Sequence, residues 1–257
     1  MVASPAVLVT RPSGQAQQLS AAVADAGYTA YSLPLLELQP VEDLRAEQRA
    51  LILDLDHYQH VIFISGNAVR FGMHWIEMIW PQLPVGLNWY AIGDATAALL
   101  AEHGINALTP ASPMTSEALL ALPQLQDVAA QRVLIVKGEG GRDTLARMLG
   151  QRGARVAELA CYRRRCPAMQ PGELAQKLSS WQIELAMISS GEGLANLLAL
   201  LSPAETTKFR HITLLVPSDR VADQAHQAGF DHVLTAENAS DGAMLQALHN
   251  WRPSPGE

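Results

Sequence analysis

Polar loops with small side chains follow several short apolar segments of this chain, and their composition suits the binding of anions. Glycine, serine and threonine dominate these loops, with an occasional arginine or lysine. Where such a loop begins a helix, the helix N-terminus adds unpaired backbone N–H groups and a partial positive charge. Each exposed contact contributes only about 0.3–1 kcal/mol, so several must act on one ligand. The loops are Thr10–Gly14, Ser65–Asn67, Gly93–Thr96, Lys137–Arg142, Ser189–Glu192 and Pro217–Arg220.

Residues of these loops are candidates for binding a substrate that carries several negative charges. Structural alternatives stay open for some of them. The run Lys137–Arg142 also suits an ordinary strand-to-helix turn, and Arg11 also suits a surface ion pair. Ser65 suits a helix N-cap rather than a nucleophile, while Pro12 suits the first turn of a helix. The candidates are Thr10, Arg11, Ser65, Asn67, Gly93, Lys137, Gly138, Ser189, Ser190, Ser218 and Arg220.

Motifs for metal, nucleotide or covalent chemistry do not emerge from the sequence. The glycine-rich run lacks both the G-K-[ST] of a P-loop and the G-x-G-x-x-G of a dinucleotide fold. The eight histidines lack metal-ligand spacing, and G-x-S-x-G does not occur. Cys161 and Cys166 form one isolated pair, which favours structural cysteines. The sequence therefore offers no recognisable motif for a metal ion, a nucleotide or a covalent nucleophile.

Composition limits the class of partner. The 257 residues include 25 acidic and 18 basic side chains, a formal net charge of −7. This balance argues against a general nucleic-acid binder, although a local cluster of donors can still hold a small anion. The N-terminal residues lack a signal-peptide pattern, and no apolar run approaches the ~18 residues of a membrane span. We expect a cytoplasmic protein without nucleic-acid or membrane partners.

Three segments of the first half recur in the second half, in the same order and at nearly one offset. The strand–helix–strand pattern from Ala6 recurs from Arg132, 126 residues later when Val7 is aligned with Val133. Segments HVIFISGNAV and LAMISSGEGL are offset by 124 residues, and Gly104 and Gly229 in the third pair by 125. Chance similarity between α/β segments is the alternative. A duplication explains the shared order and offset.

The repeated segments alternate apolar strands with amphipathic helices, which favours parallel sheets covered on both faces. Ser, Thr, Asn and Asp precede the expected helices, and glycines at 27, 104, 153 and 229 stand where helices should end. Two copies predict two lobes about a cleft, with ligands beyond the carboxyl ends of the strands. The basic run around Tyr162 leads out of one copy; a linker strand with a solvated basic edge is its structural alternative.

Together these motifs resemble the uroporphyrinogen-III synthase family over nearly the whole chain. The resemblance rests on VLVTRP, VIFISGNAV, AIGDATAALL, LIVKGEGGRDTLARMLGQRGARVAELACYRR, SSGEGLANL and VPSDRVADQAHQAGF in this order. It implies two flavodoxin-like α/β lobes with parallel sheets, joined by a two-stranded β-ladder. One lobe would be 1–36 plus 167–257 and the other 38–165, with linkers near 34–41 and 158–167.

The resemblance also implies a reaction, the cyclisation of hydroxymethylbilane to uroporphyrinogen III with inversion of ring D and loss of water, through a spiro-pyrrolenine. Tyr162 matches the active-site tyrosine in the family's YRR motif, and Thr96 matches a hydroxyl position facing the cleft. Arg11, Lys137 and Arg220 become candidate partners for substrate propionates. No cofactor is implied, and a monomer is the expected state.

Two other functions fit the same architecture. A bilobal sensor would bind a small anion and close, but the sequence has no evident helix-turn-helix or output domain. A sugar-phosphate isomerase would also use Ser/Thr-rich loops, but a clear catalytic Glu/His pair is missing. Turnover of a bilane distinguishes the first function from these two.

Overall fold

The computed structural model describes residues 4–111, 114–141 and 143–251, which divide into two compact units. Unit 1 comprises Met1–Leu38 with Arg165–Glu257, and unit 2 comprises Gln39–Arg164. The predicted lobes were 1–36 plus 167–257 and 38–165, with limits within a few residues of the bounds of these units. Positions 1–3 and 252–257 lie outside the described residues. The predicted two-stranded ladder between the lobes stays a prediction. Each unit is described by itself.

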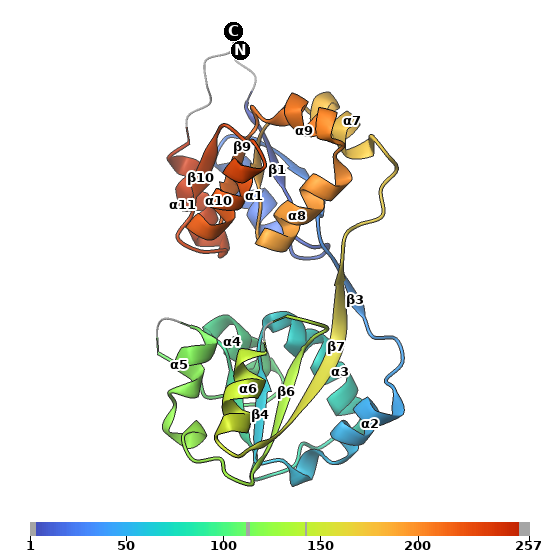
Figure 1. The fold of residues 1–257 in the computed structure, drawn as a ribbon, viewed down its shortest axis with the longest axis vertical. Coiled ribbons are helices and arrows are strands. Elements are labelled where there is room, and N and C mark those ends of the chain that lie inside the picture. Colours follow the sequence, from blue (N-terminus) through green and yellow to red (C-terminus); the bar gives the residue numbers. More distant parts are fainter. Residues whose placement is uncertain (1–3, 112–113, 142, 252–257) are drawn as a thin grey trace. The chain divides into compact units, whose positions relative to one another are not determined.

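Unit 1 contains one five-stranded sheet in the order β10-β9-β8-β1-β2, drawn in blue and in gold to red in Figure 1. All four strand pairings are parallel. Its strands are β1 (Ala6–Val9), β2 (Thr29–Ser32), β8 (Ile183–Met187), β9 (Thr213–Val216) and β10 (Val233–Thr235). Its helices are α1 (Gln17–Asp25), α7 (Glu173–Ser180), α8 (Gly191–Leu200), α9 (Pro203–Phe209), α10 (Asp219–Gln227) and α11 (Asp241–His249).

Helices cover both faces of the unit-1 sheet, because successive side chains of a strand point to opposite faces. In β1, Val7 and Val9 pack with α1 and α11, whereas Leu8 packs with α7, α8, α9 and α10. All three side chains are fully buried. This two-sided burial explains why the strands are continuous apolar runs.

The second five-stranded sheet has the order β3-β7-β6-β4-β5 and belongs to unit 2, except that the first two residues of β3 and the last residue of β7 are assigned to unit 1. Strands β4 to β7 pair in parallel. The strands are β3 (Glu37–Pro40), β4 (His60–Phe63), β5 (Asn88–Ala91), β6 (Arg132–Gly138) and β7 (Arg155–Arg165). The α-helices are α2 (Ala46–Leu53), α3 (Gly66–Ile79), α4 (Asp94–Glu102), α5 (Ser116–Leu120) and α6 (Thr144–Gln151), with 3₁₀ turns at Leu55–His57 and Pro123–Leu125.

The two sheets confirm the internal repeat. The order β9-β8-β1-β2 of unit 1 matches the order β5-β4-β6-β7 of unit 2, and each unit draws its strands from both halves of the sequence. Even β10 has a counterpart, the isolated parallel bridge between Tyr90 and Leu108. The glycines that were expected after helices, Gly27, Gly104, Gly153 and Gly229, all have positive φ.

Close packing of α3 on the unit-2 sheet depends on Gly72, and we expect Gly72→Ala to destabilise the protein. A Cβ atom at this position would lie 2.5 Å from Cγ1 of Val136, a stiff side chain on β6. Overpacking of this kind costs about 1–3 kcal/mol, more than the roughly 1 kcal/mol that alanine gains over glycine in a helix. Urea unfolding of Gly72→Ala, Val136→Ala and the double variant measures this. If the clash is the cause, Val136→Ala destabilises the Gly72→Ala background less than the wild type.

Candidate functional site

The predicted binding residues lie at the carboxyl edges of the two sheets, where strands give way to helices. Ser65 and Gly93 are the N-caps of α3 and α4 in unit 2, and Ser190 and Ser218 are the N-caps of α8 and α10 in unit 1. All four residues have extended backbone, so at each of these positions the chain turns abruptly from strand to helix. The helix N-termini point their unpaired N–H groups toward this edge.

Tyr162 and Ser65 meet at the carboxyl edge of the unit-2 sheet. Their hydroxyl oxygens are 3.3 Å apart, within hydrogen-bonding distance. Ser65 Oγ also accepts a hydrogen bond from the backbone N–H of Ala68 at 3.1 Å, which fixes its position. The Tyr162 side chain is buried, and its ring packs against Phe71 with ring centroids 5.3 Å apart. A phenol held in this way is poised to donate a hydrogen bond or a proton.

Gly138 makes room for the Tyr162 ring. The two residues are partners across β6 and β7, where the pairing register shifts, and Glu139 N–H donates to the Tyr162 carbonyl at 2.8 Å. A Cβ atom at position 138 would lie 2.6 Å from Cζ and 3.0 Å from Oη of Tyr162. Any side chain larger than glycine's would therefore displace the phenol. The structure places Gly138 in the candidate site through its lack of a side chain.

Lys137 is largely buried and forms an ion pair with the more exposed Glu158 beside a small cavity. Its Nζ donates to Oε1 of Glu158 at 2.9 Å, and only 8% of the lysine side chain is exposed. The cavity measures about 200 Å³ and is also lined by Gly138, Ser116 and Arg164. Two cations and one carboxylate thus surround it. Position 142, the last of the glycine-rich loop, lies outside the described residues.

The other unit-2 candidates belong to the first turns of α3 and α4. Thr96 is buried, and its backbone N–H donates to the Gly93 carbonyl at 3.0 Å. Gly93 is close-packed too, because a Cβ there would lie 2.7 Å from Sδ of Met114. Asn67 is partly exposed and accepts a 3.4 Å hydrogen bond from Arg70. Among the described residues, the hydroxyl partner of Tyr162 is Ser65 and not Thr96.

In unit 1, the loop after β1 forms a turn before its helix. Gln15 N–H donates to the Pro12 carbonyl at 3.0 Å, Gly14 has φ of +77°, and α1 begins only at Gln17. The expectation that Pro12 occupies the first helical turn was therefore wrong. The glycine allows a tight turn, and this turn delays the helix.

Arg11, a residue of this loop, already has partners near the start of α11. Its guanidinium lies 2.5 Å from Asp241 at the start of α11 and also donates to the Ala239 carbonyl, and 18% of the side chain is exposed. This is the ion pair that the sequence left open as an alternative. Thr10 is buried, and its hydroxyl donates to the Met187 carbonyl at 2.6 Å, joining β1 to β8.

The remaining candidates surround the N-termini of α8 and α10. Ser189 and Ser190 are partly exposed, and Ser190 Oγ accepts from the Gly193 N–H at 3.0 Å. Arg220 is exposed, and its Nη1 lies 3.5 Å from where a Cβ of Gly191 would stand. A cation thus lies beside the N-terminus of α8, an arrangement suited to a carboxylate.

Three residues near these candidates were missed by the sequence analysis: Glu158, Phe71 and Met114. The parallel register of β6 and β7 pairs Glu158 with Ile135, two residues before Lys137, and the two charged side chains meet. No sequence motif predicts that register. Phe71 and Met114 are apolar, as core residues are, so nothing in the sequence distinguishes them as residues of a site. Among the described residues, no group of three or more His, Cys, Asp and Glu side chains could hold a metal, and no helix is long and apolar enough to cross a bilayer.

The two cysteines differ in burial, and we expect one thiol to react in the native protein. Burial raises the pKa of the Cys161 thiol to about 12. Cys166 is exposed, and its pKa is raised by partial desolvation and by the Glu37 carboxylate. A disulfide reagent should titrate one thiol in buffer and two in denaturant, faster at higher pH because the thiolate reacts. Cys166→Ser should abolish the native reaction; a residual fast thiol would contradict this assignment.

The whole chain is similar to known proteins of one family. The model of the family described as "Uroporphyrinogen-III synthase HemD" matches residues 17–246. The uroporphyrinogen-III synthase of Escherichia coli K12 is 34% identical over 250 residues, 94% of this chain and 99% of the relative, and that of Proteus mirabilis is 36% identical over 181 residues, 69% and 89%.

Solved structures share the fold. A mutant uroporphyrinogen III synthase from the extremely thermophilic bacterium Thermus thermophilus aligns with a TM-score of 0.63 at 18% identity, over 96% of this chain and 98% of the other. The enzyme from Helicobacter pylori 26695 aligns with a TM-score of 0.61 at 15% identity, over 97% and 100%. Both likenesses support the two-unit α/β architecture with parallel sheets.

Proposed function

The chain belongs to the uroporphyrinogen-III synthase family, and from this premise we propose how its residues carry out the cyclisation of hydroxymethylbilane in tetrapyrrole biosynthesis. The family match over residues 17–246 supports the activity. The single structural observation that carries the mechanism is the buried Tyr162 hydroxyl, 3.3 Å from Ser65 Oγ at the carboxyl edge of a sheet.

The reaction needs assistance at one leaving group and control of one conformation. The terminal hydroxyl of the bilane leaves as water, pushed out by the electrons of its pyrrole ring, and an azafulvene results. The substituted α-carbon of ring D attacks the exocyclic methylene carbon of the azafulvene, the carbon that carried the hydroxyl group. This bond forms the spiro-pyrrolenine. Cleavage of the bond between ring D and its original bridging carbon, followed by reclosure at the other α-carbon, inverts ring D. Loss of the α-proton restores the pyrrole.

Tyr162 assists departure of the hydroxyl group in this proposal. The phenol O–H can donate a hydrogen bond to the departing oxygen, with proton transfer as the limit of this assistance. Ser65 fixes the phenol, because its own oxygen is held by the N–H of Ala68. Thr96, in the first turn of α4, is the second proposed catalytic hydroxyl.

The substrate carboxylates are held by cations and backbone N–H groups in this proposal. Lys137 and Gly138 line the 200 Å³ cavity, where one substrate carboxylate would lie among Lys137, Arg164 and Glu158. Ser65, Asn67 and Gly93 offer the N-termini of α3 and α4. In unit 1, further carboxylates are assigned to Thr10, Arg11, Ser189, Ser190, Ser218 and Arg220.

If Lys137 binds substrate in this way, Lys137→Gln raises KM about tenfold and changes kcat little, because the lost contact exists in both ground and transition states. Steady-state kinetics at several bilane concentrations measure the split. Lys177→Gln is the matched control, since Lys177 pairs with Glu173 on α7 of the other unit. A pure loss of kcat in the Lys137 variant would place the lysine in the chemical step instead.

We extend the proposal to the working state of the protein: a monomer in the cytoplasm that uses neither cofactor nor nucleic acid and does not bind membranes. The net charge of −7 supports the exclusion of nucleic acid, since phosphate backbones require a basic surface. Binding of a multiply anionic substrate then depends on local donors. Sedimentation measures the oligomeric state directly.

Freshly prepared hydroxymethylbilane tests the activity. The products are oxidised and the porphyrin isomers separated by chromatography, with an enzyme-free incubation alongside. Isomer III above the control is the expected result, because spontaneous closure yields isomer I. Isomer I alone, from folded protein and with a working reference synthase, would overturn the proposal and favour a bilobal ligand-binding protein.

A further inference from the structure

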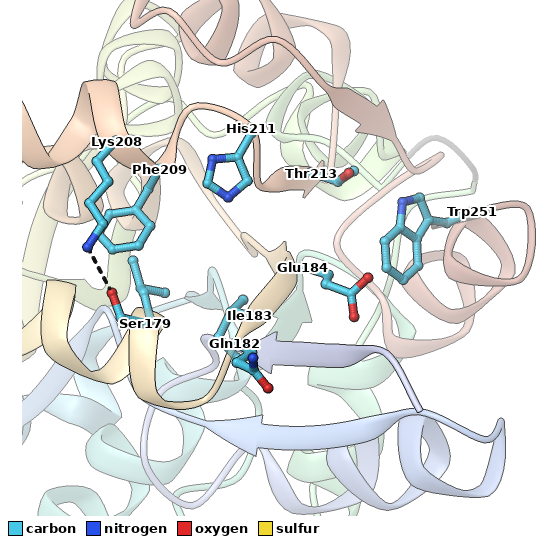
Figure 2. Close-up of a pocket in the computed structure, with 10 residues that line it drawn as sticks. Ser179, Gln182, Ile183, Glu184, Lys208, Phe209, His211, Thr213 and Trp251 are labelled. Carbon is cyan, nitrogen blue, oxygen red and sulfur yellow. Dashed lines mark hydrogen bonds between the residues drawn. The ribbon is translucent and has the colours of Figure 1, made fainter. Parts of the chain in front are cut away.

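A second cavity, of about 400 Å³, opens at the amino edge of the unit-1 sheet (Figure 2). Ile183 and Thr213, the first residues of β8 and β9, line it, whereas Ser190 and Ser218 follow the far ends of those strands. The cavity is therefore separate from the residues proposed to bind the bilane. The rest of its polar and aromatic lining comprises Ser179, Gln182, Glu184, Lys208, Phe209, His211 and Trp251.

The backbone around this cavity is irregular in two places. The pairing of β1 with β8 passes from Ile183 directly to Leu185, so Glu184 is the extra residue of a β-bulge. Gln182, two residues earlier, has φ of +51°, a conformation that glycine or asparagine usually supplies at a helix end. Bulges redirect side chains and gather near functional sites. Here the bulge turns the Glu184 carboxylate toward the cavity, as Figure 2 shows.

The duplicated unit offers an internal comparison. Since Leu185 aligns with Val61 in the repeat, the counterpart of Glu184 is His60 at the start of β4. His60 is buried, with Nδ1 at 2.9 Å from the Tyr90 hydroxyl and Nε2 on Gln131 Oε1. Strand β4 has no shift in register with either neighbour. At this position the amino edge of unit 2 is regular and occupied by the buried His60, whereas that of unit 1 is bulged and borders a cavity.

Polar groups that line the cavity are incompletely paired. Thr213 is 8% exposed, and its hydroxyl makes no hydrogen bond within the described part of the chain. Within the same residues, neither Lys208 nor Glu184 belongs to an ion pair. Lys208 Nζ donates only to Ser179 Oγ, at 3.2 Å. Thr213 lines the cavity, so its hydroxyl is available to water or to a ligand.

Opposite charges stand at opposite sides of the cavity. Figure 2 shows Lys208 and Ser179 on one side, and Glu184 and the Trp251 ring on the other. A carboxylate beside an indole ring suits an ammonium group, through charge and cation–π attraction. Glu205 is a carboxylate neighbour of Lys208, although the two form no ion pair, and the lysine ammonium suits a second carboxylate. Dianions would be repelled by Glu184, and diamines by Lys208.

We propose that this cavity binds a small zwitterion, an amino carboxylate whose ammonium group lies at Glu184 and Trp251 and whose carboxylate lies at Lys208. Thr213 and Gln182 supply hydrogen bonds between the two ends. His211, which also lines the cavity, adds a ring N–H donor for the carboxylate. The site is independent of the bilane reaction.

The test titrates the full-length protein with 4-aminobutyrate, 5-aminovalerate and 6-aminohexanoate, followed by backbone amide NMR shifts. At least one of these zwitterions should shift the amides of Gln182, Glu184 and Thr213, with a Kd about tenfold or more below those of pentanoate and pentylamine. Equal shifts with the singly charged compounds, or no saturable shift with any zwitterion, would overturn the proposal.

Two variants assign the two ends. Glu184→Gln and Lys208→Gln should each weaken zwitterion binding about tenfold, while Asp223→Asn, on the exposed side of α10, should leave it unchanged. Both lining variants should keep wild-type bilane turnover, because neither residue belongs to the proposed catalytic machinery. Unchanged zwitterion affinity in both, in folded protein, is the result that excludes this binding mode.

Discussion

Tyr162→Phe is expected to lower kcat for uroporphyrinogen III formation by about 10²–10⁴-fold, the usual contribution of a positioned general acid. The variant loses only the hydroxyl that lies 3.3 Å from Ser65 Oγ. The ring and its contact with Phe71 remain, so the fold should remain intact. Initial rates with hydroxymethylbilane measure the loss, and the share of isomer I should rise because spontaneous closure competes with a slow enzyme.

Tyr58→Phe is the matched control for this variant. Tyr58 is buried to the same degree as Tyr162 and belongs to the same unit, but it follows the 3₁₀ turn Leu55–His57, before β4, and lies beside Arg132. Removing its hydroxyl should affect stability rather than turnover. If Tyr162→Phe retained wild-type kcat, the tyrosine would have no chemical role; if both variants lost activity equally, damage to the fold would explain the result.

Gly138→Ala is expected to reduce kcat about as strongly as removal of the Tyr162 hydroxyl. The new Cβ would lie 2.6 Å from Cζ of Tyr162. Because the ring is the end of its side chain, it can turn away more easily than the two strands can separate. The Tyr162 hydroxyl is then displaced from the site. Overpacking also lowers the free energy of unfolding by about 1–3 kcal/mol. Turnover assays and urea unfolding separate the two effects.

Gly150→Ala controls for the substitution itself, since a Cβ at Gly150 on α6 meets nothing within 4 Å. Its activity should be unchanged and its stability slightly increased, because alanine favours a helix. A double variant tests the cause. In the Tyr162→Phe background, Gly138→Ala should add little further loss of kcat, because both changes remove one interaction. Full additivity would show that Gly138 acts by another route.

The ends of the helices are features that the local sequence could predict. Ser65, Ser190 and Ser240 each accept a hydrogen bond from the backbone N–H three residues ahead, as N-caps do. Gly27 and Gly229 have the positive φ expected after a helix. Local chemistry decides these features, so the sequence could predict them. The internal repeat similarly predicted two parallel sheets, because both copies share one order of strands and helices.

Contacts between distant residues were decided by the tertiary structure. Tyr162 meets Ser65, and Lys137 meets Glu158, because the parallel registers of the sheet strands set them side by side. Arg11 pairs with Asp241, 230 residues away, although its type alone suited a substrate partner equally well.

The sequence by itself therefore determined the family, the repeat and the loops that carry the candidates, because periodicity and capping are properties of neighbouring residues. Only the tertiary structure decided which candidates touch, which charges are already paired, and that Glu184 turns into a cavity, because register and packing depend on the whole sheet.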